Sequence, residues 1–151
     1  MTAVLAPENV LLDVGATTQA AVLDAIAAQA AALGITGEPA AVVAGLVARE
    51  AQGTTGLMDG IAIPHAKSPA IDRAALVVLR LRDGVEWETL DGAPVRLAIS
   101  LLIPEGEAGT THLKLLSKVA RTLMKAPVRA ELLAAETPES LVGILGEHVL
   151  A

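Results

Sequence analysis

The sequence predicts a single α/β domain over residues 1–151, with a mixed β-sheet that helices cover on both faces. Three observations predict this class. Helix-like and strand-like apolar patterns alternate along the chain, as in layered α/β folds. The length of 151 residues suits one ordinary domain. Turn signals at Asp83–Gly84 and Asp91–Gly92 separate extended segments, and this hairpin-like spacing indicates that the sheet is not wholly parallel.

Two helices are predicted in the first third of the chain, after a short apolar segment at Val10–Leu12 that predicts an edge strand. Thr18–Leu33 has apolar residues at helical spacing, and Gly34 supplies a C-terminal stop. Pro39–Glu50 predicts the second helix, because proline suits a first turn. The expected core-facing stripe of this second helix consists of Val42, Val43, Leu46 and Val47.

The rest of the chain predicts strands followed by helices. Short or Val/Leu-rich runs predict extended segments at Ile61–Ile63, Ala75–Arg82, Val85–Leu90 and Val95–Ile103, with Asp83–Gly84 ending the second of them. After a loop at Pro104–Thr111, helices are predicted from about Leu113 to Lys125, at Pro127–Ala135 and at Pro138–Val149.

Composition excludes several classes of protein. Hydrophobic residues make up 53% of the chain and charged residues 19%, as in a globular protein. No apolar run approaches the roughly 20 residues that span a bilayer, and no signal peptide is apparent, so we expect a cytoplasmic protein without membrane insertion. The chain has no cysteine and therefore no thiolate chemistry. The net charge of −6 and the lack of a basic, aromatic-rich face argue against binding of nucleic acid. A net charge of this size usually does no more than keep a protein in solution.

His65 is the first candidate for chemistry. It follows the expected strand at Ile61–Ile63 and Pro64, whose fixed φ holds the next residue at a defined exit point. An imidazole there suits a nucleophile or a base, because its ordinary pKa lies near about 6.5. Taken alone, however, a histidine in a loop is more often an ordinary surface residue.

Two further residues are candidates, each with a structural alternative. His112 lies at the start of a predicted helix, which Thr110 or Thr111 would cap, and an anion there would be stabilised by the helix dipole. The alternative is a histidine packed at the edge of the core. Arg49 lies near the end of its helix, where it either complements the dipole or grips a phosphate. His148, near the last helix end, is interpreted as complementing the dipole.

Familiar catalytic motifs are missing. The chain has no Walker-type loop, no Gly-x-Gly-x-x-Gly and no Gly-x-Ser-x-Gly elbow. His65 and His112 lack the helical spacing of a zincin, so the sequence does not favour a metal site built from them.

The chain resembles a known family through a series of motifs in order: Arg49-Glu50, Thr54-Thr55-Gly56, Gly60-Ile61-Ala62-Ile63-Pro64-His65-Ala66, then Trp87, Asp91–Val95, Ile103-Pro104 and His112-Leu113. Together they resemble enzyme IIA domains of the fructose–mannitol class of the bacterial phosphoenolpyruvate-dependent sugar phosphotransferase system. The resemblance spans nearly the whole chain. It implies a mixed sheet covered by helices, in agreement with the patterns above.

The resemblance also implies a function. His65 would accept phosphate from the histidine-containing phosphocarrier protein and pass it to a cysteine of the cognate enzyme IIB, most simply for fructose uptake. By the same resemblance, Arg49 would bind phosphate, His112 would be a second active-site histidine, and Thr54 and Thr55 would form the turn beside the site. No cofactor or metal is implied. The alternatives are a regulatory phosphocarrier of the nitrogen-related branch, and a non-catalytic binding domain or metal-binding histidine pair.

Overall fold

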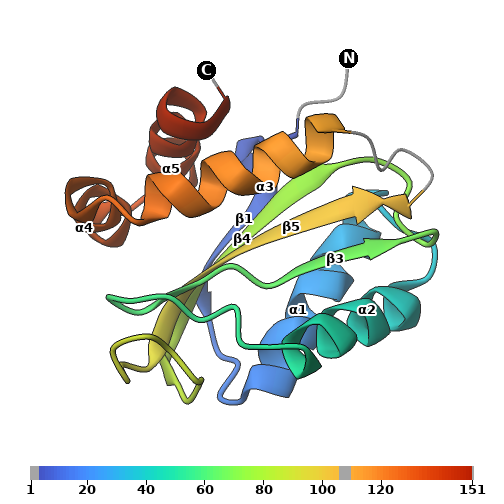
Figure 1. Ribbon diagram of the computed structural model, residues 1–151, viewed down its shortest axis with the longest axis horizontal. Helices are drawn as coiled ribbons and strands as arrows, with labels where there is room; N and C mark the ends of the chain where they lie inside the picture. The colour runs from blue at the N-terminus through green and yellow to red at the C-terminus, as the bar shows by residue number, and fades with distance from the viewer. Residues whose placement is uncertain (1–3, 106–109, 151) are drawn as a thin grey trace.

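The computed structural model describes residues 4–105 and 110–150, and the side chains of all of these except residues 110–113 and 150. A five-stranded mixed sheet lies between two layers of helices (Figure 1). The strands are β1 (Val10–Val14), β2 (Ile61–Ala62), β3 (His65–Ser68), β4 (Ala75–Val85) and β5 (Val95–Pro104). The predicted fold class is therefore confirmed.

Strand β5 is the centre of the site-bearing half of the sheet. It pairs antiparallel with β4 on one side, and parallel with β2 and β3 on the other. Strand β1 pairs parallel with β4, so the order is β1–β4–β5 with β2 and β3 along the far edge. His65 lies opposite Leu101 of β5, which places the candidate histidine on that edge.

Helices α1 (Gln19–Ala32) and α2 (Pro39–Ala51) cover one face of the sheet. Thr18 caps α1, because its side chain accepts a hydrogen bond from the amide of Ala21. Pro39 starts α2 as predicted. In α2, Val42 and Leu46 are fully buried, whereas Val47 is 49% exposed, so the expected stripe is wrong at Val47.

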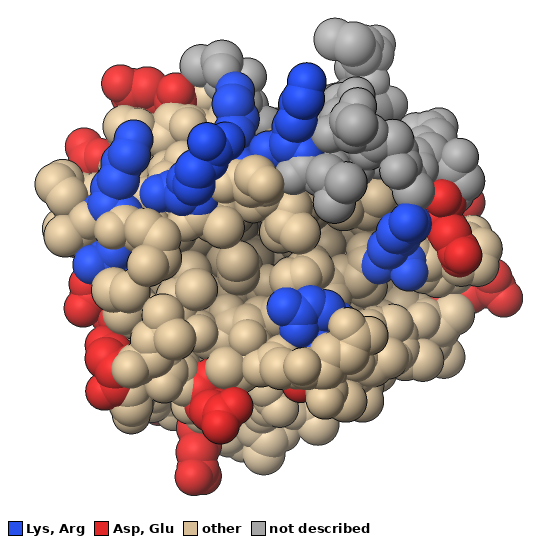
Figure 2. Space-filling model, in the orientation of Figure 1, with Lys and Arg blue, Asp and Glu red and all other residues tan. Residues whose placement is uncertain are grey.

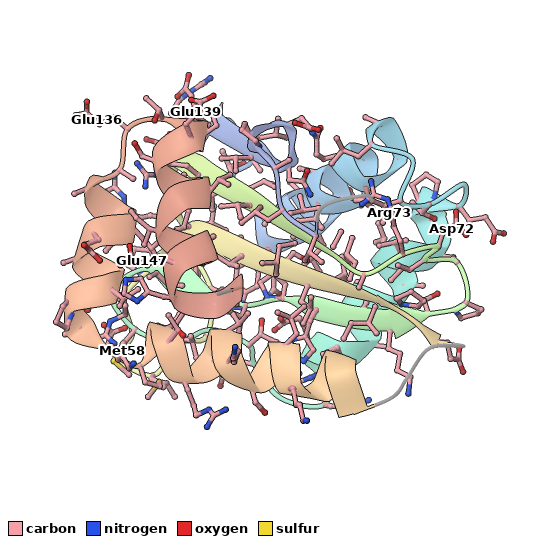
Figure 3. All side chains as sticks on the ribbon, turned by 90° about the horizontal axis from the view of Figure 1, so that it is seen from above. Met58, Asp72, Arg73, Glu136, Glu139 and Glu147 are labelled. Carbon is pink, nitrogen blue, oxygen red and sulfur yellow. The ribbon has the colours of Figure 1, made fainter. Side chains whose placement is uncertain are left out.

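Helices α3 (Thr110–Leu123), α4 (Ala126–Ala134) and α5 (Pro138–Leu145) cover the other face, and a π-helical turn follows at Gly146–Leu150. Figure 3 looks onto these helices from above, with Glu136 and Glu139 near the α4–α5 connection and Asp72 and Arg73 at the opposite end. None of the helices among the described residues has the length and apolar character needed to cross a bilayer.

The core consists of two apolar clusters, one on each face of the sheet. Alternate residues of β4 and β5 contribute to each, as the pleat of a strand requires. Val77 and Ala98 pack beneath α1 and α2, whereas Val78 and Ile99 pack beneath α3 to α5. Because both faces of the sheet are buried, the sequences of these strands are nearly continuous apolar runs.

Three sequence predictions are corrected by the fold. His65 does not lie in a loop, because it begins β3. Asp83–Gly84 does not end its strand, since β4 continues to Val85, which pairs with Val95. The expected extended segment Val85–Leu90 contributes only Val85 to a strand, although Trp87 within it is buried.

Candidate active site

The edge strand β3 holds His65 through its own backbone and that of the residues before it. The carbonyl of Pro64 accepts a hydrogen bond from the amide of Leu101 at 3.2 Å, which ties the approach to His65 to β5. Ala66 packs in the cluster beneath α2, so the pleat turns the side chain of His65 away from that cluster. The imidazole lies half-buried at the sheet edge.

Both ring nitrogens of His65 have partners. Nδ1 lies 2.7 Å from the carbonyl oxygen of Ile63, and a carbonyl can only accept, so this nitrogen carries the proton of a neutral ring. Nε2 lies 3.0 Å from Nε of Arg49 and accepts its hydrogen. An arginine is always a donor, so the neighbours of the ring favour the tautomer with its lone pair on Nε2.

The surroundings of this imidazole favour its neutral form. Burial lowers the pKa of His65 below its ordinary value of 6.5, and the positive charge of Arg49 lowers it further. The hydrogen bond to the Ile63 carbonyl and the negative charge of Glu50 act in the opposite direction. A neutral ring has one unprotonated nitrogen, here Nε2, whose lone pair can attack an electrophile once Arg49 gives up its hydrogen bond.

Arg49 connects His65 to the turn after α2. Its Nη1 donates to the carbonyl oxygen of Gly53 at 2.7 Å, while its Nε donates to His65. The sequence left two interpretations of Arg49, as a complement to the helix dipole or as a phosphate-binding residue. Its contact with His65 favours the second. A pocket of about 270 Å³ surrounds this pair, and its lining includes Gln52 and Lys67.

Thr54 and Thr55 shape the same turn. Thr54 donates its hydroxyl hydrogen to the carbonyl of Glu88 at 2.5 Å and accepts from the amide of Gly56. Thr55 is buried, and both its amide and its hydroxyl donate to the carboxylate of Glu50. Both hydroxyls are thus engaged within the protein, so these threonines fix the conformation of the turn beside His65.

Glu50 is a site residue that the residue-by-residue reading of the sequence did not select. It accepts both hydrogen bonds from Thr55, and its negative charge acts to raise the pKa of His65. A carboxylate directly after Arg49 at a helix end, followed by two threonines, was the available signal. Its function depends on a turn geometry that the sequence does not specify.

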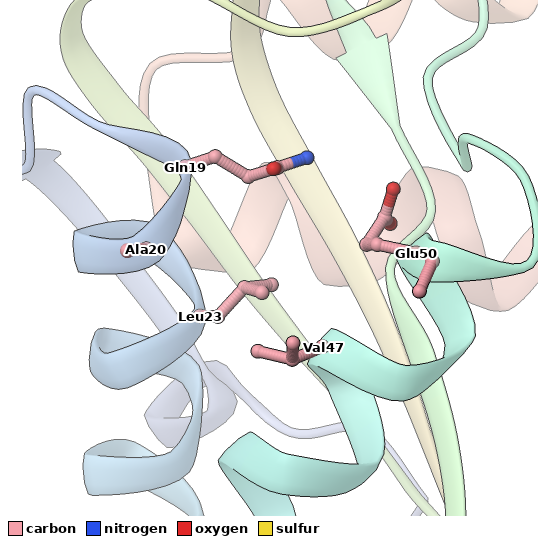
Figure 4. A pocket seen from close by; sticks show the side chains of 6 residues that line it. Gln19, Ala20, Leu23, Val47 and Glu50 are labelled. Carbon is pink, nitrogen blue, oxygen red and sulfur yellow. The ribbon is translucent and has the colours of Figure 1, made fainter.

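A second pocket lies on the other side of α2, between that helix and α1. It has a volume of about 380 Å³, and Leu23 and Val47 form its apolar part. Figure 4 shows Gln19 and Glu50 extending toward one another above these two residues. The carboxylate of Glu50 is already bonded to Thr55, so this pocket adjoins the site through a shared side chain.

The backbone places His112 in the first turn of α3. Its side chain lies outside the described residues, as do those of the proposed capping residues Thr110 and Thr111. His148 lies in the C-terminal π-helical turn, 3.6 Å from the carboxylate of Glu131. Among the described residues, no cluster of three or more His, Cys, Asp or Glu side chains is placed to hold a metal ion.

Comparison with known proteins gives this arrangement a family. The family model described as "Phosphoenolpyruvate-dependent sugar phosphotransferase system, EIIA 2" matches residues 3–148. The chain belongs to this EIIA family. Domains of the family are phosphoryl-transfer components of the phosphotransferase system, so the sequence-based identification is confirmed.

Relatives of this EIIA domain fall into two groups. It is 41% identical over 100 residues to the fructose-specific EIIABC component of Bacillus subtilis, covering 66% of this chain but only 16% of that protein. It is 36% identical over 146 residues to a nitrogen regulatory protein of Bradyrhizobium diazoefficiens, covering 96% of this chain and 94% of the relative. The chain thus spans about a sixth of the first relative and nearly all of the second.

Solved structures share the fold of this EIIA domain. The crystal structure of nitrogen regulatory protein IIA-Ntr from Neisseria meningitidis superimposes with a TM-score of 0.83 at 30% identity, covering 94% of this chain and 96% of that one. A complex of enzyme IIA-Mtl with phosphorylated enzyme IIB-Mtl from Escherichia coli gives 0.77 at 20% identity, covering 95% and 97%. At that identity the second likeness concerns the fold alone.

Proposed function

We propose that this EIIA domain accepts a phosphoryl group on Nε2 of His65 from the histidine-containing phosphocarrier protein and passes it to a cysteine of a cognate enzyme IIB. The observation that carries the proposal is the pair of contacts on the ring: the Ile63 carbonyl on Nδ1 and the Arg49 guanidinium on Nε2. The first leaves Nε2 as the nucleophilic nitrogen. The second places a permanent cation where a phosphoryl group would arrive.

The transfer is a displacement at phosphorus. The lone pair of Nε2 forms a new phosphorus–nitrogen bond, the donor's phosphorus–nitrogen bond breaks, and the donor nitrogen keeps that electron pair. For this attack Arg49 gives up its hydrogen bond to Nε2 and turns its N–H groups to the phosphoryl oxygens. In the onward step a thiolate of enzyme IIB attacks phosphorus, and the lone pair returns to Nε2.

The second histidine and the threonine turn have supporting roles in this proposal. His112, in the first turn of α3, balances the charge of the phosphoryl group together with the helix N-terminus. Thr54 and Thr55 hold the turn whose Gly53 carbonyl orients Arg49.

The first prediction tests the phosphoryl acceptor. Incubation with phosphoenolpyruvate, enzyme I and the phosphocarrier protein should give one phosphate per chain, labile to acid and stable to base. His65→Ala should abolish the label, because no other described histidine has this environment, and His148→Ala serves as the matched control that labels normally. Equal labelling of wild type and His65→Ala, followed by mass spectrometry, would show that the acceptor is another residue.

A second prediction concerns His112. His112→Ala should still be labelled but should pass phosphate to enzyme IIB at least about tenfold more slowly, because one charge-balancing group is lost. Single-turnover transfer from the isolated phosphoprotein measures this step, and circular dichroism checks the fold. Loss of folding instead of loss of transfer would support the packed-histidine alternative.

Fructose is the favoured sugar class for transport, because two relatives are fructose-specific components.

The second candidate function is regulatory. It is favoured by the end-to-end match to a protein named nitrogen regulatory protein. Rapid transfer of phosphate from His65 to the IIB domain of a fructose system would support transport. Complete labelling without onward transfer to that domain would support regulation.

A further inference from the structure

Strand β5 is irregular where it meets the start of β2. The amides of two consecutive residues, Arg96 and Leu97, both donate to the carbonyl oxygen of Gly60, at 2.7 and 3.0 Å. Two residues of one strand opposite one residue of its neighbour form a β-bulge. Val95 and Leu97 also lie in different apolar clusters, although residues two apart in a regular strand share a face. A bulge redirects a side chain, and here that side chain is Arg96.

Arg96 lines a cavity of about 330 Å³ together with Arg80 of β4. The remaining lining residues are Asp59, Leu81 and Leu133. The cavity lies between the sheet and the C-terminal end of α4, where Arg80 donates to the carbonyls of Leu132 and Ala135. It shares no described lining residue with the pocket beside His65, so the two are separate places on the molecule.

The cavity carries more positive charge than its neighbours balance. Among the described residues that line it, only Asp59 is acidic, and its carboxylate already accepts a hydrogen bond from Nε of buried Arg129 at 2.8 Å. Three arginines against one aspartate leave an excess of two positive charges. Burial, and after it the positive charge of Arg96, lower the pKa of Arg80. An arginine stays protonated even so, and two like charges therefore face one cavity.

Both guanidinium groups keep N–H donors that the protein does not use. Arg80 uses two of its five in binding the end of α4. The side chain of Arg96 makes no hydrogen bond or ion pair with the residues that the structure describes. Capping of α4 accounts for Arg80, but it does not account for a second arginine that a bulge turns into the same cavity.

The net charge of −6 does not exclude an anion site, because charge is unevenly distributed over this protein. Figure 2 shows lysine and arginine side chains gathered over α3 and toward α4, whereas acidic side chains lie mainly toward the margins of this face. A local excess of positive charge attracts an anion whatever the sign of the whole molecule.

We propose that the cavity binds the phosphate group of a small phosphorylated metabolite. A phosphate monoester carries a charge of about −1.5 to −2 at pH 7 and three acceptor oxygens, so it matches the excess charge and accepts from both guanidinium groups at once. A carboxylate has one charge and two oxygens, which a single guanidinium satisfies. The volume is that of a small-molecule site, and Leu81 and Leu133 supply an apolar wall for a carbon skeleton. This inference does not depend on the proposed function.

The test is an NMR titration of the purified protein with glycerol 3-phosphate at constant ionic strength. The amide signals of Arg80, Arg96 and Leu133 should shift and saturate, with half-saturation below about 5 mM. Arg96→Gln should weaken this binding at least about tenfold and leave the fold intact, because the Arg96 side chain has no hydrogen bond to lose. Arg73→Gln removes the same charge at the opposite end of the molecule (Figure 3) and should stay within about twofold of wild type.

Inorganic phosphate and acetate decide the class of ligand. Inorganic phosphate should shift the same amides, and acetate should bind at least about tenfold more weakly. Equal binding of acetate would overturn the assignment to phosphate, and binding of inorganic phosphate without glycerol 3-phosphate would overturn the assignment to a monoester.

Two further comparisons place the binding on the molecule. Arg49→Gln should remove any phosphate-induced shift around His65 and leave the shifts around Arg96 unchanged. Equal affinity of wild type and Arg96→Gln, or no saturable shift at the cavity amides up to about 20 mM, would show that Arg80 and Arg96 form no anion site.

Discussion

At the scale of single residues, the site depends on the difference between the two nitrogens of one imidazole. Ile63 and His65 are two positions apart, and the path through Pro64 turns the Ile63 carbonyl back onto Nδ1. This contact comes from the backbone, so it persists in any variant that keeps β3 in place. Arg49 reaches the other nitrogen from a different element.

The titration of His65 gives a third prediction. An NMR titration should find the pKa of His65 below 6.5, because burial and Arg49 both disfavour the charged ring. Arg49→Gln should raise this pKa by removing a positive charge, and Glu50→Gln should lower it by removing a negative one. An unchanged pKa in both variants would mean that burial alone lowers it.

The same pKa affects stability in a defined direction. The folded protein binds a proton on His65 less readily than the unfolded chain does, since its folded pKa is lowered. The stabilising contribution is therefore complete above about pH 6.5 and is lost as the pH falls through the folded pKa.

At the scale of elements, the turn after α2 allows very little room. A Cβ atom on Gly56 would lie 2.3 Å from the carbonyl oxygen of Glu88, whereas one on Gly37 would meet nothing within 4 Å. The 54–56 turn and the segment after β4 are thus in backbone contact, and Thr54 also bonds to Glu88.

A fourth prediction uses this contrast. Gly56→Ala should lower the free energy of unfolding by more than about 2 kcal/mol, because one backbone segment must move away from another. Gly37→Ala, the control, should change it by less than about 1 kcal/mol in either direction. Urea denaturation of both variants measures the difference. Equal stability of the two would show that the Glu88 segment yields at little cost.

The helices could be predicted from the sequence, whereas two features of the sheet could not. Thr18 and Pro39 mark helix starts through local chemistry, and the structure confirms both. Strand β3, with the sequence His-Ala-Lys-Ser, has no apolar run, because it is an edge strand defined by its pairing with β5. Asp83–Gly84 has turn-forming residues, but pairing of the long hairpin arms carries β4 past them.

The site was predictable only in its parts. The family motifs placed His65, Arg49 and the threonine turn in one region. The hydrogen bonds of the ring, and the use of both threonine hydroxyls within the protein, depend on distances between elements far apart in sequence. The role of Glu50 also could not be predicted, because its partner Thr55 lies beyond the end of the helix that carries Glu50.

At the scale of the whole molecule, the two apolar clusters support different parts of the site: α2, which carries Arg49, packs on one, and Ile63 and Leu101 beside His65 belong to the other. Leu46 of α2 belongs to the cluster nearer Arg49, and Leu132 of α4 to the other, and both are fully buried. A defect in the α4 cluster should therefore affect stability without moving Arg49.

A fifth prediction follows for Leu132. Leu132→Ala should lower the free energy of unfolding by about 2–5 kcal/mol through the cavity it leaves. The rate of His65 phosphorylation should remain within about twofold of wild type at temperatures where the variant is folded. Leu46→Ala should cost similar stability but also slow phosphorylation, because it removes packing beneath α2. Identical kinetic losses in both variants would show that the core acts as one unit.

The central position of β5 has a consequence for hydrogen exchange. Its backbone is bonded to β4 on one side and to β2 and β3 on the other, and both of its faces are buried. Its amides should therefore exchange with deuterium only when the whole domain unfolds. The amide of Leu101, which donates to the Pro64 carbonyl, belongs to this slowest class. Deuterium uptake at this amide would thus report the stability of the whole domain, to which the Pro64–His65 segment is tied through this hydrogen bond.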